Sequence, residues 1–92
     1  MFFNKRKHPR KQVTDCFIEG YSQAWSCSGK VKDLSEGGIR AHLEITPPMG
    51  ARVHVYMECE NGADIKRDAM VVWFIESTPP EVGAMVGLKF ID

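Results

Sequence analysis

A run of strict period-two alternation constrains the fold of this chain most. In Arg52-Val53-His54-Val55-Tyr56-Met57-Glu58, three apolar side chains alternate with larger or polar ones. This is the pattern of a β-strand with one buried face. Asn61-Gly62 follows, and these residue types readily take the positive φ angles of a tight type I′ hairpin turn. The segment 65–75, rich in β-branched and aromatic residues, supplies the returning strand, so the sequence predicts a β-hairpin.

The rest of the chain also has the pattern of short strands. Cys16, Ile18 and Gly20 alternate with their neighbours in a strand that starts at Val13 and runs into the polar stretch 26–29. Further strands are predicted at 30–34, at 39–43 and around Val86, Leu88 and Phe90. Residues 46–50 form a loop, because Pro47 and Pro48 cannot donate to a sheet ladder. No segment has a convincing helical period. Six short strands favour an all-β antiparallel barrel or sandwich, since closure covers both the apolar face and the edges.

Charge divides the chain into two parts. The 92 residues suffice for one hydrophobic core, and the 12 basic and 12 acidic residues cancel. Five of the basic residues nevertheless lie between positions 5 and 11, without an acid, and Pro9 disfavours helix for His8. We therefore expect a flexible basic arm at residues 1–12 and a β-barrel domain at residues 13–92.

Several classes of protein are disfavoured. The chain has no apolar run long enough for a signal peptide core or a membrane span, which predicts a cytoplasmic protein without membrane insertion. Cys16, Cys27 and Cys59 are odd in number and form no C-x-x-C pair, so we expect reduced thiols in or near the core. The three histidines have no metal-ligand spacing, and no metal site or cofactor is predicted.

The arm carries the first candidate binding residues. Arg6 and Arg10 lie four residues apart, and each guanidinium can donate paired hydrogen bonds to a phosphate or to guanine O6 and N7. Their planar faces can also stack on a base. A basic tail alone is more often a solvated chain end.

A second candidate is the segment Asp33-Leu34-Ser35-Glu36-Gly37-Gly38. The Asp33 carboxylate can accept from guanine N1–H and N2–H together, and the Ser35 hydroxyl can bond a phosphate oxygen. Gly37 and Gly38 would let backbone N–H groups approach an anion. The alternative is an ordinary turn between strands, in which Asp33 and Ser35 bond the local backbone.

Together the two segments resemble the signature of the PilZ family, R-x-x-x-R followed some twenty-odd residues later by [D/N]-x-S-x-x-G. Arg6 and Arg10 match the first element, and Asp33, Ser35 and Gly38 match the second. The resemblance implies a small six-stranded antiparallel PilZ-type barrel whose arm folds across the bacterial second messenger cyclic di-GMP. It places the arginines on phosphates and guanine edges, with the Asp-x-Ser-x-x-Gly turn underneath.

Three further residues enter through the same resemblance. Lys5 stands where family members often have another arginine, so the charge is kept while the planar fork is lost. Both a single ligand and an intercalated pair stay open. Trp73 lies where some relatives have an aromatic residue near a guanine, with a core tryptophan as the alternative. His42 is a weaker candidate for the ligand rim.

No catalytic motif is present in the sequence, so we expect a ligand sensor and no enzyme. As a sensor and adaptor, the chain would signal to an unidentified protein effector through closure of the arm. One alternative is a PilZ-like interaction module that binds no nucleotide. A more distant one is a single-stranded nucleic-acid-binding barrel, with Tyr21, Trp25 and Tyr56 as part of a stacking platform.

Overall fold

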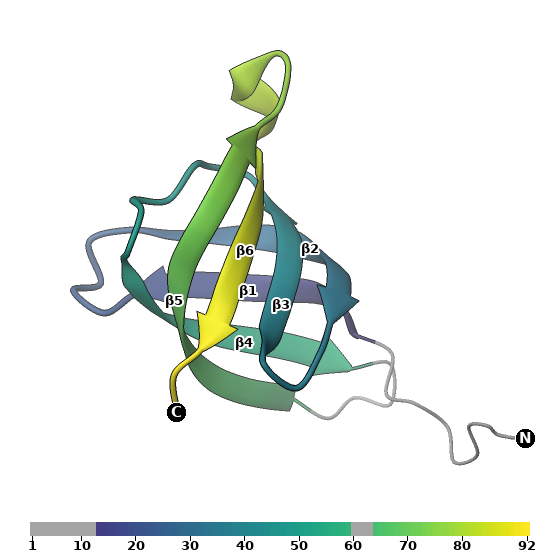
Figure 1. Ribbon diagram of the computed structural model, residues 1–92, viewed down its shortest axis with the longest axis vertical. Helices are drawn as coiled ribbons and strands as arrows, with labels where there is room; N and C mark the ends of the chain where they lie inside the picture. The colour runs from purple at the N-terminus through teal and green to yellow at the C-terminus, as the bar shows by residue number, and fades with distance from the viewer. Residues whose placement is uncertain (1–12, 60–63) are drawn as a thin grey trace, which may run out of the picture.

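The computed structural model describes residues 13–59 and 64–92, which form a closed antiparallel β-barrel. Its strands are β1 (Val13–Gly20), β2 (Ser26–Leu34), β3 (Gly38–Leu43), β4 (Arg52–Cys59), β5 (Asp64–Glu76) and β6 (Ala84–Phe90), with a short 3-10 helix η1 (Pro80–Val82) before β6. The order around the barrel is β1-β2-β3-β6-β5-β4. In Figure 1, β3, β5 and β6 lie in front, and β1 and β4 run behind them at a large angle. The predicted six-stranded all-β fold is confirmed.

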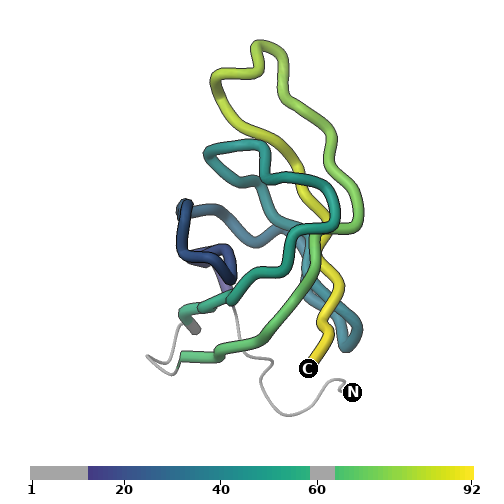
Figure 2. The backbone as a smooth tube through the Cα atoms, turned by 90° about the vertical axis from the view of Figure 1, so that its left-hand side faces the viewer, coloured from purple at the N-terminus to yellow at the C-terminus, as the bar shows by residue number. Residues whose placement is uncertain are grey.

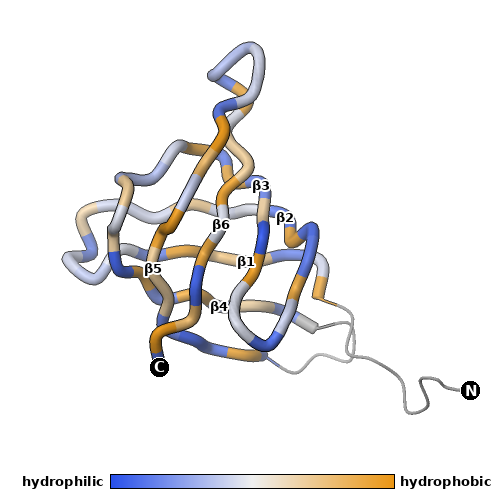
Figure 3. Tube along the Cα trace, in the orientation of Figure 1, coloured by the Kyte–Doolittle hydropathy of each residue, from blue (hydrophilic) through white to orange (hydrophobic). Residues whose placement is uncertain are grey.

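The core consists of the inward half of each alternating strand. Figure 3 shows hydrophobic and hydrophilic residues alternating along the strands. Ile18, Leu43 and Val55 are completely buried, and so are the small side chains of Ala41 and Ala84. The alternation predicted for β1 and β4 is therefore the one observed.

The second strand begins earlier than predicted. Residues 26–29 belong to β2, with Ser26 paired to Glu19, and do not extend the first strand. Cys27 points inward and is buried with the core, so the polar composition of this stretch comes from its outward positions. The turn is at residues 21–25, where the Trp25 indole lies against Gly20.

Two other predictions for this part of the chain have separate outcomes. Antiparallel pairing of β4 with β5, from Arg52↔Met70 to Glu58↔Asp64, confirms the hairpin partners. The Asn61-Gly62 turn lies outside the described residues, and so does the arm at residues 1–12. Within the described residues, no helix has the length and apolarity needed to cross a membrane.

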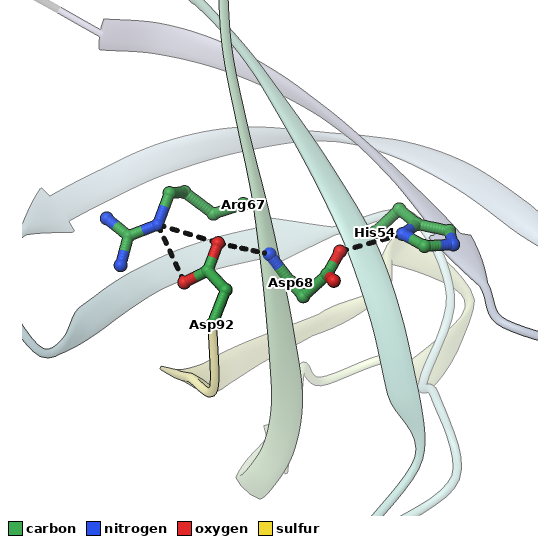
Figure 4. A network of polar contacts seen from close by, with 4 residues as sticks. All are labelled: His54, Arg67, Asp68 and Asp92. Atoms are coloured by element: carbon green, nitrogen blue, oxygen red, sulfur yellow. Dashed lines mark hydrogen bonds and ion pairs between the residues drawn. The ribbon is translucent and has the colours of Figure 1, made fainter.

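A polar network connects Asp92 to the first half of β5 (Figure 4). Arg67 Nε donates to both Asp92 carboxylate oxygens at 2.9 and 3.0 Å, and the Asp68 backbone N–H donates to Asp92 Oδ2 at 3.0 Å. On β4, His54 Nδ1 lies 2.8 Å from Asp68 Oδ1. The hydrogen bond from His54 lowers the pKa of Asp68, and the bonds from Asp68 N–H and Arg67 lower the pKa of Asp92.

Candidate functional site

One cross-strand row on the outside of the barrel brings together two of the predicted site residues. Asp33 on β2 pairs with Arg40 on β3, Arg40 pairs with Gly87 on β6, and Gly87 pairs with Trp73 on β5. The row therefore spans four strands, with the carboxylate at one end and the indole at the other. Residues 40 apart in sequence become members of one surface.

Each end of this row follows a β-bulge. The register shifts between Val31 and Asp33 on β2, and again between Val71 and Trp73 on β5. A bulge adds one residue to a strand, so the side chains after it change faces relative to simple alternation. Since Val71 points into the core, regular alternation would also turn Trp73 inward. The bulges instead place Asp33 and Trp73 on the outer face.

A groove of about 300 Å³ follows this row. Its lining includes Asp33, Arg40, Trp73 and Lys89, with Gly38 and Gly87 in its floor. The Asp33 side chain is 66% exposed, and its Oδ2 lies 4.0 Å from Arg40 Nη2. An exposed ion pair at that distance contributes little to stability, so the carboxylate can exchange Arg40 for a ligand donor.

Trp73 lies on the barrel surface and is no core tryptophan. It is 38% exposed, and its indole packs so closely on Gly87 that a Cβ at this position would lie 2.2 Å from Nε1. A side chain at position 87 would therefore displace the ring. Gly87 holds the indole against the sheet and leaves its other face accessible.

The turn at residues 35–38 contributes Ser35, Gly37 and Gly38 to the lining of the groove. The Ser35 backbone N–H donates to the Gly38 carbonyl at 2.9 Å, and the Ser35 hydroxyl lies 3.3 Å from the same oxygen. The local backbone bond considered for Ser35 is thus present, and the hydroxyl must rotate to donate to a phosphate. Its oxygen lone pairs remain available as acceptors.

The two glycines of the turn have different surroundings. A Cβ on Gly38 would lie 2.1 Å from the Leu88 carbonyl oxygen, whereas a Cβ on Gly37 would meet nothing within 4 Å. Neither glycine has a positive φ. Gly38 is therefore required for close approach of β3 to β6, and Gly37 leaves the backbone open toward the groove.

The remaining predicted residues lie elsewhere. Lys5, Arg6 and Arg10 fall outside the described residues, so their position relative to the groove stays a prediction. His42 does not line the groove; its Nε2 lies 3.1 Å from Ser77 Oγ.

Aromatic side chains gather on a different outer face, over β1 and β4. Phe17, Tyr21 and Tyr56 are exposed there, and the Phe17 and Tyr56 rings are 6.3 Å apart. Trp25 does not join them, because its ring packs over Gly20 and partly against the core. The platform considered for a nucleic acid is thus present in part. A groove of about 710 Å³ lies beside it, and its lining includes Lys30, which pairs with Asp15 at 2.6 Å, and four carboxylates (Asp15, Glu44, Glu58 and Asp64). The acidic excess opposes a phosphate backbone.

Sequence reasoning missed Arg40, Gly87 and Lys89. Arg40 could have been predicted from the sequence, because strand alternation places it on the same outward face as Gly38, two residues earlier. A glycine inside a strand signals close approach of another group, which here is the Trp73 ring on Gly87. The bulges that complete the row have no comparable sequence signal.

Comparisons with known proteins agree with this geometry. The chain is similar to the crystal structure of the PilZ domain of CeSA from a cellulose-synthesising bacterium, with a TM-score of 0.64 and 16% identity over 94% of this chain and 83% of that one. A search of curated proteins gave no match. A family model for the PilZ domain matches residues 4–92, which cover the arm, the barrel and the groove. The chain therefore belongs to the PilZ family of cyclic di-GMP receptors.

Proposed function

We propose that the chain binds cyclic di-GMP in the groove of Asp33, Arg40, Gly87 and Trp73. The observation that carries the proposal is the cross-strand row, which holds an exposed carboxylate and a half-exposed indole on one surface. Asp33 accepts from guanine N1–H and N2–H, and the free face of Trp73 stacks on a base. Such stacking contributes roughly 1–3 kcal/mol per base. Arg40 and Lys89 add positive charge beside the groove for the phosphates.

The arm completes the proposed site. Arg6 and Arg10 donate to phosphates and guanine edges, and Lys5 adds a third cation without a planar fork. Closing the arm over the ligand changes the surface that the barrel offers to a protein effector. The chain then acts as a sensor and adaptor with no catalytic step and no cofactor. The family match supports this role, since it includes the arm from residue 4 onward.

Isothermal titration with cyclic di-GMP tests binding, with GTP and a short single-stranded oligonucleotide as competing ligand classes. Asp33→Ala removes a charged acceptor and should weaken binding about ten- to a hundredfold. Glu36→Ala is the matched control, because it removes the same charge from an exposed position of the adjacent turn. The stoichiometry distinguishes one ligand from an intercalated pair.

The outcomes separate the candidate functions. Saturable binding selective for cyclic di-GMP, lost in Asp33→Ala and kept in Glu36→Ala, supports the proposal. No binding of any nucleotide by the wild-type chain refutes it and leaves an interaction module. Binding of the oligonucleotide that falls steeply with salt would favour the nucleic-acid barrel instead.

Hydrogen exchange tests the arm. Ligand should protect the amides of residues 1–12, and Arg10→Ala should abolish this protection. Unchanged protection in that variant would contradict arm closure, even where titration still shows binding.

A further inference from the structure

The outer face of β1, β4 and β5 carries a row of like charges. Asp15 on β1 pairs with Glu58 on β4, and Glu58 pairs with Asp64 on β5, so three carboxylates follow one another across three strands. Lys30 on β2 extends the row and forms an ion pair with Asp15 at 2.6 Å. Within residues 13–59 and 64–92, Glu58 and Asp64 have no ion-pair partner. Like charges directly opposite one another destabilise a sheet, so strand pairing gives no reason for this row.

The row lies in the lining of the groove of about 710 Å³, which also has an aromatic wall. Phe17 and Tyr56 form this wall, and both rings are exposed. Lys66 Nζ lies 6.0 Å from the centroid of the Tyr56 ring, so a cation already approaches this wall. Glu44, which directly follows β3, adds a fourth carboxylate. We call this surface the acidic groove, defined by its carboxylates and aromatic rings: Asp15, Phe17, Glu44, Tyr56, Glu58 and Asp64.

The acidic groove suits an extended segment that carries several cations. Its carboxylates are distributed along the groove, and the aliphatic stems of lysine and arginine can pack on the rings between them. A single exposed ion pair contributes little to binding, so the occupant needs several such pairs. A covalent tether to the barrel also lowers the entropic cost of docking.

The basic arm, residues 1–12, meets both requirements. It carries five cations between positions 5 and 11 and no acid. It joins β1 at Val13, and Asp15 of the acidic groove is only two residues further along the chain. An extended chain spans roughly 3.3 Å per residue, so Arg10 can reach about 10 Å and Lys5 about 26 Å from Val13. Neighbouring strands are about 4.8 Å apart, so the row from Asp15 to Asp64 lies within reach.

We propose that the basic arm docks in the acidic groove when no nucleotide is bound, with its cations on the row of carboxylates and their stems on the aromatic wall. Among the described residues, this groove shares no lining residue with the groove proposed for cyclic di-GMP. Figures 1 and 2 show β1 and β6 on opposite sides of the barrel, purple at the left and yellow at the right in Figure 2. An arginine of the arm therefore occupies one groove or the other. That cyclic di-GMP must draw the arm out of the acidic groove is a consequence that rests on the proposed function.

Carbodiimide crosslinking of the full chain without nucleotide tests the docking. The reagent joins a lysine amine and a neighbouring carboxylate as an amide. Lys5 and Lys7 are informative, because they lie at least six residues before Val13. In the monomer band, mass spectrometry should find them linked to the acidic groove roughly fivefold more often than to Glu36, an exposed carboxylate outside it. Equal linkage to Glu36 and to the acidic groove would overturn the proposal.

Trypsin tests the same docking through the accessibility of the arm. Proteolysis follows the population of the undocked arm, so Glu58→Gln combined with Asp64→Asn should release the first residues roughly threefold faster or more. Glu36→Gln combined with Glu81→Gln is the matched control, because it removes two charges from exposed positions outside the acidic groove. Equal release in the two double variants would overturn the proposal and leave the acidic groove for a basic segment of another protein.

Titration with cyclic di-GMP separates this proposal from the proposed function. The apparent affinity falls with the fraction of arm that is docked, so Glu58→Gln with Asp64→Asn should tighten binding about two- to fivefold relative to the control. A chain that crosslinks to the acidic groove but binds no cyclic di-GMP would refute the proposed function and support the docking. A chain that binds cyclic di-GMP without such crosslinks would refute the docking and keep the proposed function.

Discussion

Replacing Gly38 by alanine tests the role of the last glycine in the Asp-Leu-Ser-Glu-Gly-Gly turn. An added Cβ would lie 2.1 Å from the Leu88 carbonyl oxygen and 3.2 Å from Lys89 Cα, and all of these are backbone atoms. A flexible side chain could move aside, but a paired strand cannot. β3 and β6 must therefore separate by more than an ångström at the Gly38↔Lys89 pair.

The cost has two parts. Forcing extra volume into a close-packed contact destabilises by about 1–3 kcal/mol. Separation also weakens the hydrogen bond from Phe90 N–H to the Gly37 carbonyl, now 2.9 Å long, at about 1 kcal/mol. The sum of about 2–4 kcal/mol should lower the melting temperature by roughly 10–30 °C in a domain of this size. Gly37→Ala should change the free energy of unfolding by less than about 0.5 kcal/mol, since its Cβ would meet nothing.

Thermal unfolding followed by circular dichroism, with urea titration beside it, compares the two variants. The glycines are adjacent and belong to the same turn, so differences in expression or composition are minimal. Equal melting temperatures for Gly38→Ala and Gly37→Ala would refute the reasoning. So would a Gly38→Ala barrel of wild-type stability that had lost only ligand binding, because that result would assign the glycine to the ligand rather than to strand pairing.

Three other properties follow from the structure. Ile18 is completely buried, so Ile18→Ala should lower the free energy of unfolding in urea by about 2–5 kcal/mol, and a loss below about 1 kcal/mol would contradict its place in the core. Burial raises the pKa of Cys16 to about 12, so iodoacetamide should label this thiol only on unfolding, as peptide mass spectrometry would show; rapid labelling of the native chain would be inconsistent with it. The pKa values of Asp68 and Asp92 are lower in the folded chain than the ordinary value of 3.8. As the pH falls below 3.8, the unfolded chain therefore binds more protons than the folded chain, and the contribution of the two carboxylates to the free energy of unfolding is lost. Asp92→Asn should therefore reduce the acid dependence of stability relative to Glu36→Gln, and identical acid unfolding curves for the two variants would exclude this contribution.

Much of the barrel was predictable because its strands alternate regularly. The segments around Val53, Ile18 and Leu88 have one apolar face each, and the structure places these residues in the core. The start of β2 was not predictable in this way. Its inward positions are occupied by Cys27 and Gly29, and Gly29 gives no apolar signal although it packs beneath Leu43.

The sequence predicted only the part of the candidate site whose residues are close together along the chain. Asp33, Ser35 and Gly38 belong to one short turn, so their proximity follows from their spacing. Trp73 lies forty residues later, and its face depends on the strand register. The resemblance placed it near a guanine, and a core tryptophan was the alternative. In the structure, regular alternation from Val71 would turn Trp73 into the barrel. The bulge before Trp73 decides between the two positions.

The same bulge determines which side chains of β5 face the groove. Up to Val71 the outer edge of the strand is occupied by β4 and its preceding loop. One extra residue, Val72, then turns Trp73 outward onto Gly87 and changes which backbone groups face β6. If Val72 instead took its own place in the ladder, regular alternation would turn the indole inward and Phe74 outward, and the groove would lose its aromatic end. A single added residue therefore brings the indole into the lining of the groove.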